Sequence, residues 1–212
     1  MEKILKTYTD SDHVWIVCTG ESLNGFDLSI LSGLNVIAVN KAFLYLETVD
    51  AVVSIDKDTY EECYDILKRL DPVMVATNRS SNQLSHAMVD LKPFELQITG
   101  PGGLDPRPGR VRWGFNAGYT ALHFAWTQGA RNIHILGMDL THKHFYDDDE
   151  ITGRSSHYIE PHLRDFMRTL EYLPNQDTKI TYYGPYGFEG FIRRPLSEAH
   201  RIAKELKQEV EL

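Results

Sequence analysis

The sequence predicts an α/β fold, namely a single Rossmann-like, doubly wound domain with a mostly parallel sheet and a long loop or lid excursion. Short runs of β-branched residues recur along the chain, and the first two are almost continuously apolar, which is typical of strands buried on both faces. Segments with helical spacing of apolar residues separate several of these runs. This alternation favours a parallel sheet with helices on both of its faces.

The expected elements follow one another along the chain. Each expected strand is rich in valine or isoleucine and has an ordinary strand length. The expected strands are residues 14–18, 36–39, 51–54, 73–76, 133–136 and 180–183. The expected helices are residues 58–70, 117–127, 163–173 and 195–212. The last of these begins at Pro195 and carries its apolar residues on one side, as a docked amphipathic helix does.

Two longer segments interrupt this alternation within the single domain expected for residues 1–212. Residues 78–113 contain four prolines and four glycines, so we expect an excursion with one strand at residues 94–98 that folds over or beside a site. Residues 141–156 are polar and are expected to be mobile until a ligand binds.

Composition excludes several classes of protein. The chain has 212 residues, of which 42% are hydrophobic and 11% aromatic, so it is neither disordered nor a disulfide-stapled miniprotein. A formal net charge of −8 disfavours nucleic acid as the main partner. Two cysteines and no apolar stretch of membrane-spanning length predict a cytoplasmic protein without a membrane span. The sequence leaves open whether the protein forms a homo-oligomer.

Strand ends locate the candidate ligand site. In an open parallel sheet the ligand lies beyond the carboxyl ends of the strands, where the strand order reverses. This rule selects polar and small residues that follow the first, second, third and fifth expected strands. The selected residues are Thr19, Gly20, Ser22, Asn40, Asp56, Gly137, Asp139 and Thr141.

Two segments suit an anionic ligand, and the first of them follows the first expected strand. Residues 19–25 include small residues that let backbone N–H groups approach an anion at the start of the next helix, although an ordinary turn is the alternative. This loop contains neither G-x-G-x-x-G nor Gly-Lys-Ser/Thr, so NAD binding and P-loop ATP hydrolysis lose their main support. At a later helix start, Asn116 can serve as the N-cap, and Ala117 and Gly118 let the helix pack close to a ligand or a strand.

Acidic residues and histidines give weaker signals. Asp139 follows a strand tip, where it can accept from a ribose hydroxyl, bind a metal or cap the next turn. The acidic run 147–150 matches an Asp-x-Asp pattern, but a solvated acidic patch is the favoured interpretation. Histidines at 142, 144, 157 and 162 are a weak zinc pattern, so no metal site is predicted.

A second group of candidate residues lies at the mouth of an expected helix. His157, Tyr158 and His162 offer a base near neutral pH and a phenol that can donate to an anion. Surface histidines without a catalytic role are the alternative interpretation.

The order of these motifs resembles the bacterial sialyltransferases of glycosyltransferase family 42. The resemblance covers residues 14–185 without the middle excursion. It depends on the segments 14–23, 36–43, 116–119, 135–139 and 156–159. The Gly-x-Ser-Leu loop and the Gly-x-Asp strand tip also look like those of archaeal 6-hydroxymethylpterin diphosphokinases, which perform different chemistry.

The resemblance implies a donor site. The resemblance implies that Gly20, Ser22 and Asn40 contact the nucleotide of the donor. Asp139 matches the family's strand-tip acid. The helix start near the donor phosphate is formed by Asn116, Ala117 and Gly118. The chain has Glu21 where the family has proline, beside the expected donor phosphate. The identity of the donor therefore stays open.

The resemblance also implies catalytic residues. His162 is the nearest equivalent of the family's general base, and His157 is the alternative. Tyr158 matches the tyrosine of the family's His-Tyr-Ile segment. The family tyrosine that steadies the leaving phosphate falls at Thr141 here, which leaves Tyr146 as the phenol of that loop.

We therefore expect a metal-independent, inverting glycosyl transfer from a nucleotide-activated sugar, with a CMP-sugar favoured, to an acceptor hydroxyl, and no cofactor. One alternative is a diphosphokinase in which Asp56 and Asp139 hold magnesium across ATP phosphates. Another is a nucleotide-binding module without turnover. A modified DNA base is a less favoured acceptor, with the phosphates met by Arg107, Arg110 and Arg112.

Overall fold

A computed structural model describes residues 5–77, 86–139, 145, 159–171, 177–185 and 187–210. Nine strands form one open sheet in which every neighbouring pair is parallel. The strands are β1 (His13–Val17), β2 (Asn35–Val39), β3 (Ala51–Val53), β4 (Val73–Thr77), β5 (Phe94–Gly100), β6 (Arg110–Arg112), β7 (Asn132–Leu136), β8 (Lys179–Tyr183) and β9 (Ile192–Arg194). This confirms the predicted α/β class, and the sheet is entirely parallel where the sequence predicts a mostly parallel one.

The strand order places the candidate site. It runs β6-β5-β4-β3-β2-β1-β7-β8-β9, so the chain builds the sheet outward from β1 in one direction and then returns to continue on its other side with β7. The order therefore reverses between β1 and β7. Because Val17 pairs with Leu136 and with Ala38, the loops that follow β1, β2 and β7 begin at nearly the same level.

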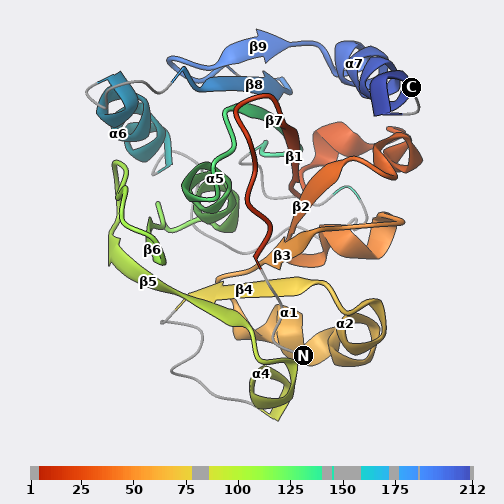
Figure 1. The fold of residues 1–212 in the computed structure, drawn as a ribbon, viewed down its shortest axis with the longest axis vertical. Coiled ribbons are helices and arrows are strands. Elements are labelled where there is room, and N and C mark those ends of the chain that lie inside the picture. Colours follow the sequence, from red (N-terminus) through yellow and green to blue (C-terminus); the bar gives the residue numbers. More distant parts are fainter. Residues whose placement is uncertain are drawn as a thin grey trace.

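Helices cover both faces of the sheet (Figure 1). Helices α5 (Ala117–Thr127) and α6 (Ile159–Glu171) pack on one face. The other face is covered by α1 (Lys57–Glu62), α2 (Tyr64–Leu70), α4 (His86–Leu91) and α7 (Leu196–Val210). Within the described segments, no helix has the length and apolar character needed to cross a membrane.

Most expected elements are present, with shifts at their ends. The helix expected at 117–127 matches α5, whereas the helix expected at 58–70 is broken at Cys63 into α1 and α2. The connections from β1 to β2 and from β2 to β3 contain short 3₁₀ helices instead of α-helices. These are η1 (Glu21–Leu23), η2 (Leu28–Leu31) and η3 (Asn40–Tyr45).

The segment 78–113 differs from the expected excursion. Where it is described, it contributes α4 and two strands, β5 and β6, which extend the sheet, whereas the sequence predicts one strand. The prolines mark boundaries and do not interrupt elements, because Pro93 precedes β5 and Pro101 follows it directly. Among the described residues of this segment, the connection 101–109 between β5 and β6 is a loop.

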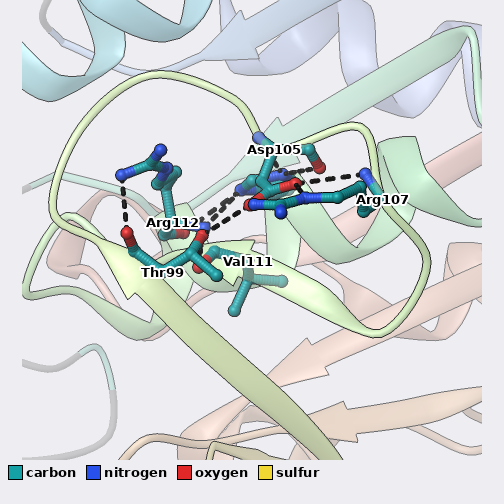
Figure 2. Close-up of polar contacts among 6 residues, drawn as sticks. Thr99, Asp105, Arg107, Val111 and Arg112 are labelled. Atoms are coloured by element: carbon teal, nitrogen blue, oxygen red, sulfur yellow. Dashed lines mark hydrogen bonds and ion pairs between the residues drawn. The ribbon is translucent and has the colours of Figure 1, made fainter.

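A cluster of polar side chains closes this connection (Figure 2). The Asp105 side chain is 2% exposed and accepts from Arg107 Nε at 2.7 Å and from Thr99 Oγ1 at 2.8 Å. The Arg107 guanidinium holds the pKa of Asp105 well below its usual range. Arg112 Nη1 donates to the backbone oxygen of Thr99 at 2.7 Å. Of the three arginines considered for phosphate binding, Arg107 therefore bonds within the connection, and Arg112 bonds from β6 to the neighbouring β5.

His123 of α5 bonds to Asp105 within the same connection and to Arg112 of β6, which follows it. Its Nδ1 lies 2.7 Å from the Arg112 backbone nitrogen, and its Nε2 lies 3.0 Å from the Asp105 carbonyl oxygen. A neutral ring with its proton on Nε2 satisfies both contacts, and burial lowers the pKa of His123, which favours the neutral form. The connection is therefore anchored to α5.

Candidate functional site

The loops after β1 and β7 are tied together at the point where the strand order reverses. The Ser22 backbone N–H donates to Asp139 Oδ2 at 2.5 Å, and Ser22 Oγ donates to Asp139 Oδ1 at 2.6 Å. The Tyr182 hydroxyl of β8 lies 3.4 Å from Oδ1. The Asp139 side chain is only 2% exposed, so this carboxylate joins two loops through charge-assisted bonds.

Glycine is required at the centre of this junction. The Gly20 N–H donates to the Gly137 carbonyl oxygen at 2.7 Å. A β-carbon on Gly20 would lie 2.5 Å from both Asp139 Oδ2 and the Gly137 oxygen. Gly137 has φ of +66°, a left-handed conformation that glycine adopts without steric cost.

The structure adds detail to one expectation for this junction. The sequence predicts that small residues in 19–25 let backbone N–H groups approach an anion at the start of the next helix, with an ordinary turn as the alternative. The helix that follows β1 is the three-residue η1, and the Ser22 N–H within it is bonded to Asp139. Anion binding by residues 19–25 stays a prediction, and the Ser22 N–H is engaged within the junction.

The start of α5 completes the junction. Asn116 caps the helix by accepting from the Tyr119 N–H at 3.1 Å, as the sequence predicts for the N-cap. A β-carbon on Gly118 would lie 3.0 Å from Cys18 Sγ and 3.1 Å from Met138 Sδ. The close approach expected at Ala117 and Gly118 is therefore made to the tips of β1 and β7. It places the amino terminus of α5 at the same junction.

Residues after the neighbouring strands lie around this junction. Thr19 is buried, and its carbonyl oxygen accepts from the Phe145 N–H at 3.0 Å. Asn40, after β2, has φ of +51°, and its buried Oδ1 has no hydrogen-bond partner among the described residues. Asp56 follows β3 and therefore lies one strand further from the reversal point, with its N–H donating to Ser54 Oγ at 3.1 Å.

His162 lies in a separate depression, which we call the His162 pocket. It has a volume of about 500 Å³. Its walls are Pro101, Gly102, Gly103, His162, Asp165, Arg168 and Thr169. His162 Nδ1 and Asp165 Oδ2 both face Gly102, where a β-carbon would lie 2.8 Å and 3.0 Å from them.

Tyr119 links the junction to this pocket, and the sequence analysis missed it. Its hydroxyl lies 2.6 Å from the Gly103 carbonyl oxygen and 3.2 Å from the His162 carbonyl oxygen, so its proton is shared between the pocket loop and α6. Burial raises the pKa of Tyr119, which keeps the hydroxyl protonated. A tyrosine one turn after the Asn116 cap, on a helix with few polar residues, is the signal that could have found it.

Several predicted site residues lie outside the described residues. They are Thr141, Tyr146, His157 and Tyr158, together with the acidic run 147–150 and the histidines at 142 and 144. Their roles stay predictions. Within the described ranges, no group of three or more histidine, cysteine, aspartate or glutamate side chains is placed to hold a metal ion.

Comparison with known proteins supports the fold. No protein-family model and no curated protein matches the sequence. The solved structure of a MAf glycosyltransferase from Magnetospirillum magneticum AMB-1 is similar to this chain, with a TM-score of 0.60 and 16% identity over 92% of this chain. The match covers 35% of that protein, so the chain spans about a third of its length. The chain therefore shares its fold with part of a glycosyltransferase.

Proposed function

We propose that the protein transfers a sugar from a nucleotide-activated donor to an acceptor hydroxyl. One observation carries the proposal: Ser22 and Asp139 join the loops after β1 and β7 against the start of α5, at the reversal of strand order. Ligands of open parallel sheets bind at this position. The likeness to a glycosyltransferase fold supports sugar transfer as the reaction.

The start of α5 is suited to the phosphate of the donor. The first N–H groups of an α-helix have no acceptor within the helix, and the helix dipole places partial positive charge there. Ala117 and Gly118 occupy these positions next to the two strand tips. A nucleoside monophosphate leaving group carries less charge than a diphosphate, so these dipoles suit a CMP-sugar without a metal ion.

Asn40 supports nucleotide binding beside the phosphate. Buried polar atoms nearly always have a partner, and an exception points to a group supplied from elsewhere. The Asn40 Oδ1 has no partner in the described residues, and Asn40 has a left-handed backbone at the first residue of η3. An N–H or O–H group of the nucleotide would satisfy this oxygen.

His162 is the proposed general base. As the acceptor oxygen forms its bond to the anomeric carbon, the bond from that carbon to the donor phosphate breaks, and its electron pair leaves with the nucleotide. The acceptor proton passes to the His162 imidazole. Attack opposite the departing phosphate inverts the anomeric centre.

The contacts of Asp139 disfavour the diphosphokinase alternative. That reaction requires Asp139 and Asp56 to hold magnesium. Both oxygens of Asp139 already accept from Ser22, and Tyr182 lies close to one of them. Binding a cation there would cost the bonds that close the junction.

A thermal-shift experiment tests the proposal. The protein is melted with CMP, CDP, UDP, GDP or ATP, each with magnesium or EDTA. We expect CMP to raise the melting temperature in EDTA, because a ligand at 100 times its Kd adds about 2.7 kcal/mol, or roughly 5–10 °C for a chain of this size. Stabilisation by ATP and magnesium alone would overturn the proposal in favour of the diphosphokinase.

Two variants locate the binding site. Asn40→Ala should reduce the shift caused by CMP. Asn132→Ala is the matched control, because Asn132 lies at the opposite, amino-terminal end of β7, where its amide donates to the Asp10 carbonyl oxygen. Equal shifts in the two variants would argue against nucleotide binding at the carboxyl ends of the strands. Release of CMP from CMP-activated sugars then reports turnover.

A further inference from the structure

The His162 pocket lies beside the junction and outside it. Its walls come from the connection after β5 and from one side of α6. Its volume of about 500 Å³ is in the range of sites for small molecules. Tyr119 bonds to the carbonyl oxygens of Gly103 and His162, so the pocket is fixed to the same helix that begins at the junction.

The pocket presents polar groups of both signs. Asp165 and Arg168 lie one turn apart on α6, and both side chains are exposed. Neither forms an ion pair with another residue in the described part of the chain. A carboxylate accepts hydrogen bonds and a guanidinium donates them, so this pair suits a neutral ligand with several hydroxyl groups.

An exposed aromatic ring stands next to the pocket. The Phe115 ring centre lies 5.9 Å from that of His162 and 4.5 Å from that of Trp113. Phe115 is 47% exposed, and its φ is +56°. A bulky residue in this left-handed region is strained, and an exposed ring recovers little of that cost by burial.

Backbone bonds hold this ring toward the pocket loop. The Gly114 N–H donates to the Pro101 carbonyl oxygen at 2.8 Å, and the Asn116 N–H donates to the Trp113 carbonyl oxygen at 2.8 Å. Gly114 also has a left-handed φ, of +53°. The turn that presents Phe115 is therefore anchored between the pocket loop and the start of α5.

We propose that the His162 pocket is the acceptor subsite and that it binds a carbohydrate ring, an inference that rests on the proposed function. The apolar C–H face of the sugar packs on Phe115, because an aromatic face offers a large and rigid apolar surface. Asp165 and Arg168 bond to its hydroxyl groups. His162 then faces the hydroxyl that receives the donor sugar.

Ligand-observed saturation-transfer NMR tests this proposal without a donor. The probes are methyl β-D-galactopyranoside, methyl α-D-glucopyranoside and N-acetyl-D-glucosamine at millimolar concentration. We expect the ring C–H protons of at least one probe to receive saturation from the wild-type protein. Phe115→Ala should weaken that binding about fivefold, which corresponds to roughly 1 kcal/mol for an aromatic contact.

Two further variants make the result decisive. Phe115→Asn removes the ring but keeps a residue that tolerates a left-handed backbone, so it separates lost stacking from a changed turn. Phe94→Ala is the matched control, because Phe94 is 37% exposed and lies at the opposite end of β5 from the pocket loop. The proposal predicts weak binding in both Phe115 variants and unchanged binding in Phe94→Ala.

The results that would overturn the acceptor subsite differ from those that would overturn the proposed function. Binding of no sugar, or equal binding by Phe115→Ala and wild type, would overturn the acceptor subsite. So would glycosylation of a peptide with serine and threonine hydroxyls by a protein that glycosylates none of the three sugars. If a sugar binds through Phe115 but no nucleotide stabilises the protein, the carbohydrate site stands and the proposed transfer reaction fails.

Discussion

The junction between β1 and β7 and the His162 pocket differ in how their polar groups are held. At the junction, the Asp139 carboxylate is almost fully buried and both of its oxygens accept from Ser22. In the pocket, Asp165 is exposed and faces an open depression of about 500 Å³. The junction is preorganised, whereas the pocket presents groups that a ligand can engage.

Two consecutive residues of α5 contact the junction and the His162 pocket, respectively. Gly118 packs against Cys18 and Met138 at the junction, and Tyr119 bonds to Gly103 and His162 at the pocket. Under the proposed function, the closely packed junction would hold the donor and the more open pocket would receive the acceptor. Substitutions in the junction should therefore reduce stability first, and substitutions at the pocket should change binding or turnover first.

Gly20→Ala should have the largest effect on stability. The added methyl group would lie 2.5 Å from Asp139 Oδ2 and from the Gly137 oxygen, so the two loops must separate. Gly20 has φ of −67°, so steric overlap and not backbone strain is the cause. We expect a loss of about 3 kcal/mol from overpacking and broken hydrogen bonds, or roughly 6–12 °C in the melting temperature.

Gly187→Ala is the matched control for this substitution. Among the described residues, the one contact of a β-carbon at Gly187 is with Arg193 Cδ at 3.8 Å, which is ordinary van der Waals contact. Urea unfolding of both variants should show a large loss for Gly20→Ala and almost none for Gly187→Ala. Similar losses in the two variants would mean that the junction is not tightly packed.

Asp139→Asn should have the next largest effect. The substitution keeps the shape of the side chain but removes its charge, and it turns an –NH₂ group toward one of the two Ser22 donors. Losing charge-assisted bonds at a buried site costs about 1.5–3 kcal/mol. The free energy of unfolding, measured in urea, should fall by that amount.

Asp27→Asn provides a close comparison for the same chemistry at the surface. Asp27 also accepts from a serine, through Ser29 N–H at 3.0 Å and Ser29 Oγ at 2.6 Å, but it lies in an exposed turn. We expect its substitution to cost clearly less than Asp139→Asn, because water replaces the lost bonds. Equal costs would contradict the view that burial makes the junction strong.

The sequence locates the junction better than the pocket, for a physical reason. Gly20, Ser22 and Asp139 each follow an apolar run within a few residues, and parallel strands bring such positions to one edge of the sheet. The contacts of Tyr119 span 16 residues to Gly103 and 43 to His162, and no local pattern encodes them. The strand expected at 94–98 matches β5, whereas β6 is not predicted, because its three residues, Arg110–Arg112, offer a single apolar side chain as a signal.

Tyr119→Phe should have the smallest effect on stability and the most selective effect on function. It removes one hydroxyl and leaves the carbonyl oxygens of Gly103 and His162 without that donor. The expected cost is about 1 kcal/mol, or roughly 2–4 °C. Because the hydroxyl joins the pocket loop to α6, we also expect kcat for sugar transfer to fall while the KM for the nucleotide donor is unchanged.

Tyr60→Phe is the control that separates an effect of Tyr119 on the position of His162 from a general loss of stability. Its buried hydroxyl also donates to a carbonyl oxygen, that of Val75 at 2.7 Å, but Tyr60 packs on the opposite face of the sheet. Tyr60→Phe should cost at least as much stability as Tyr119→Phe, because the Tyr60 hydroxyl also accepts from the Ser54 N–H at 3.2 Å. Only Tyr119→Phe should lower kcat and weaken sugar binding in the pocket. If Tyr60→Phe lowers kcat equally, Tyr119 contributes stability alone, and the link from the junction to the pocket does not position His162.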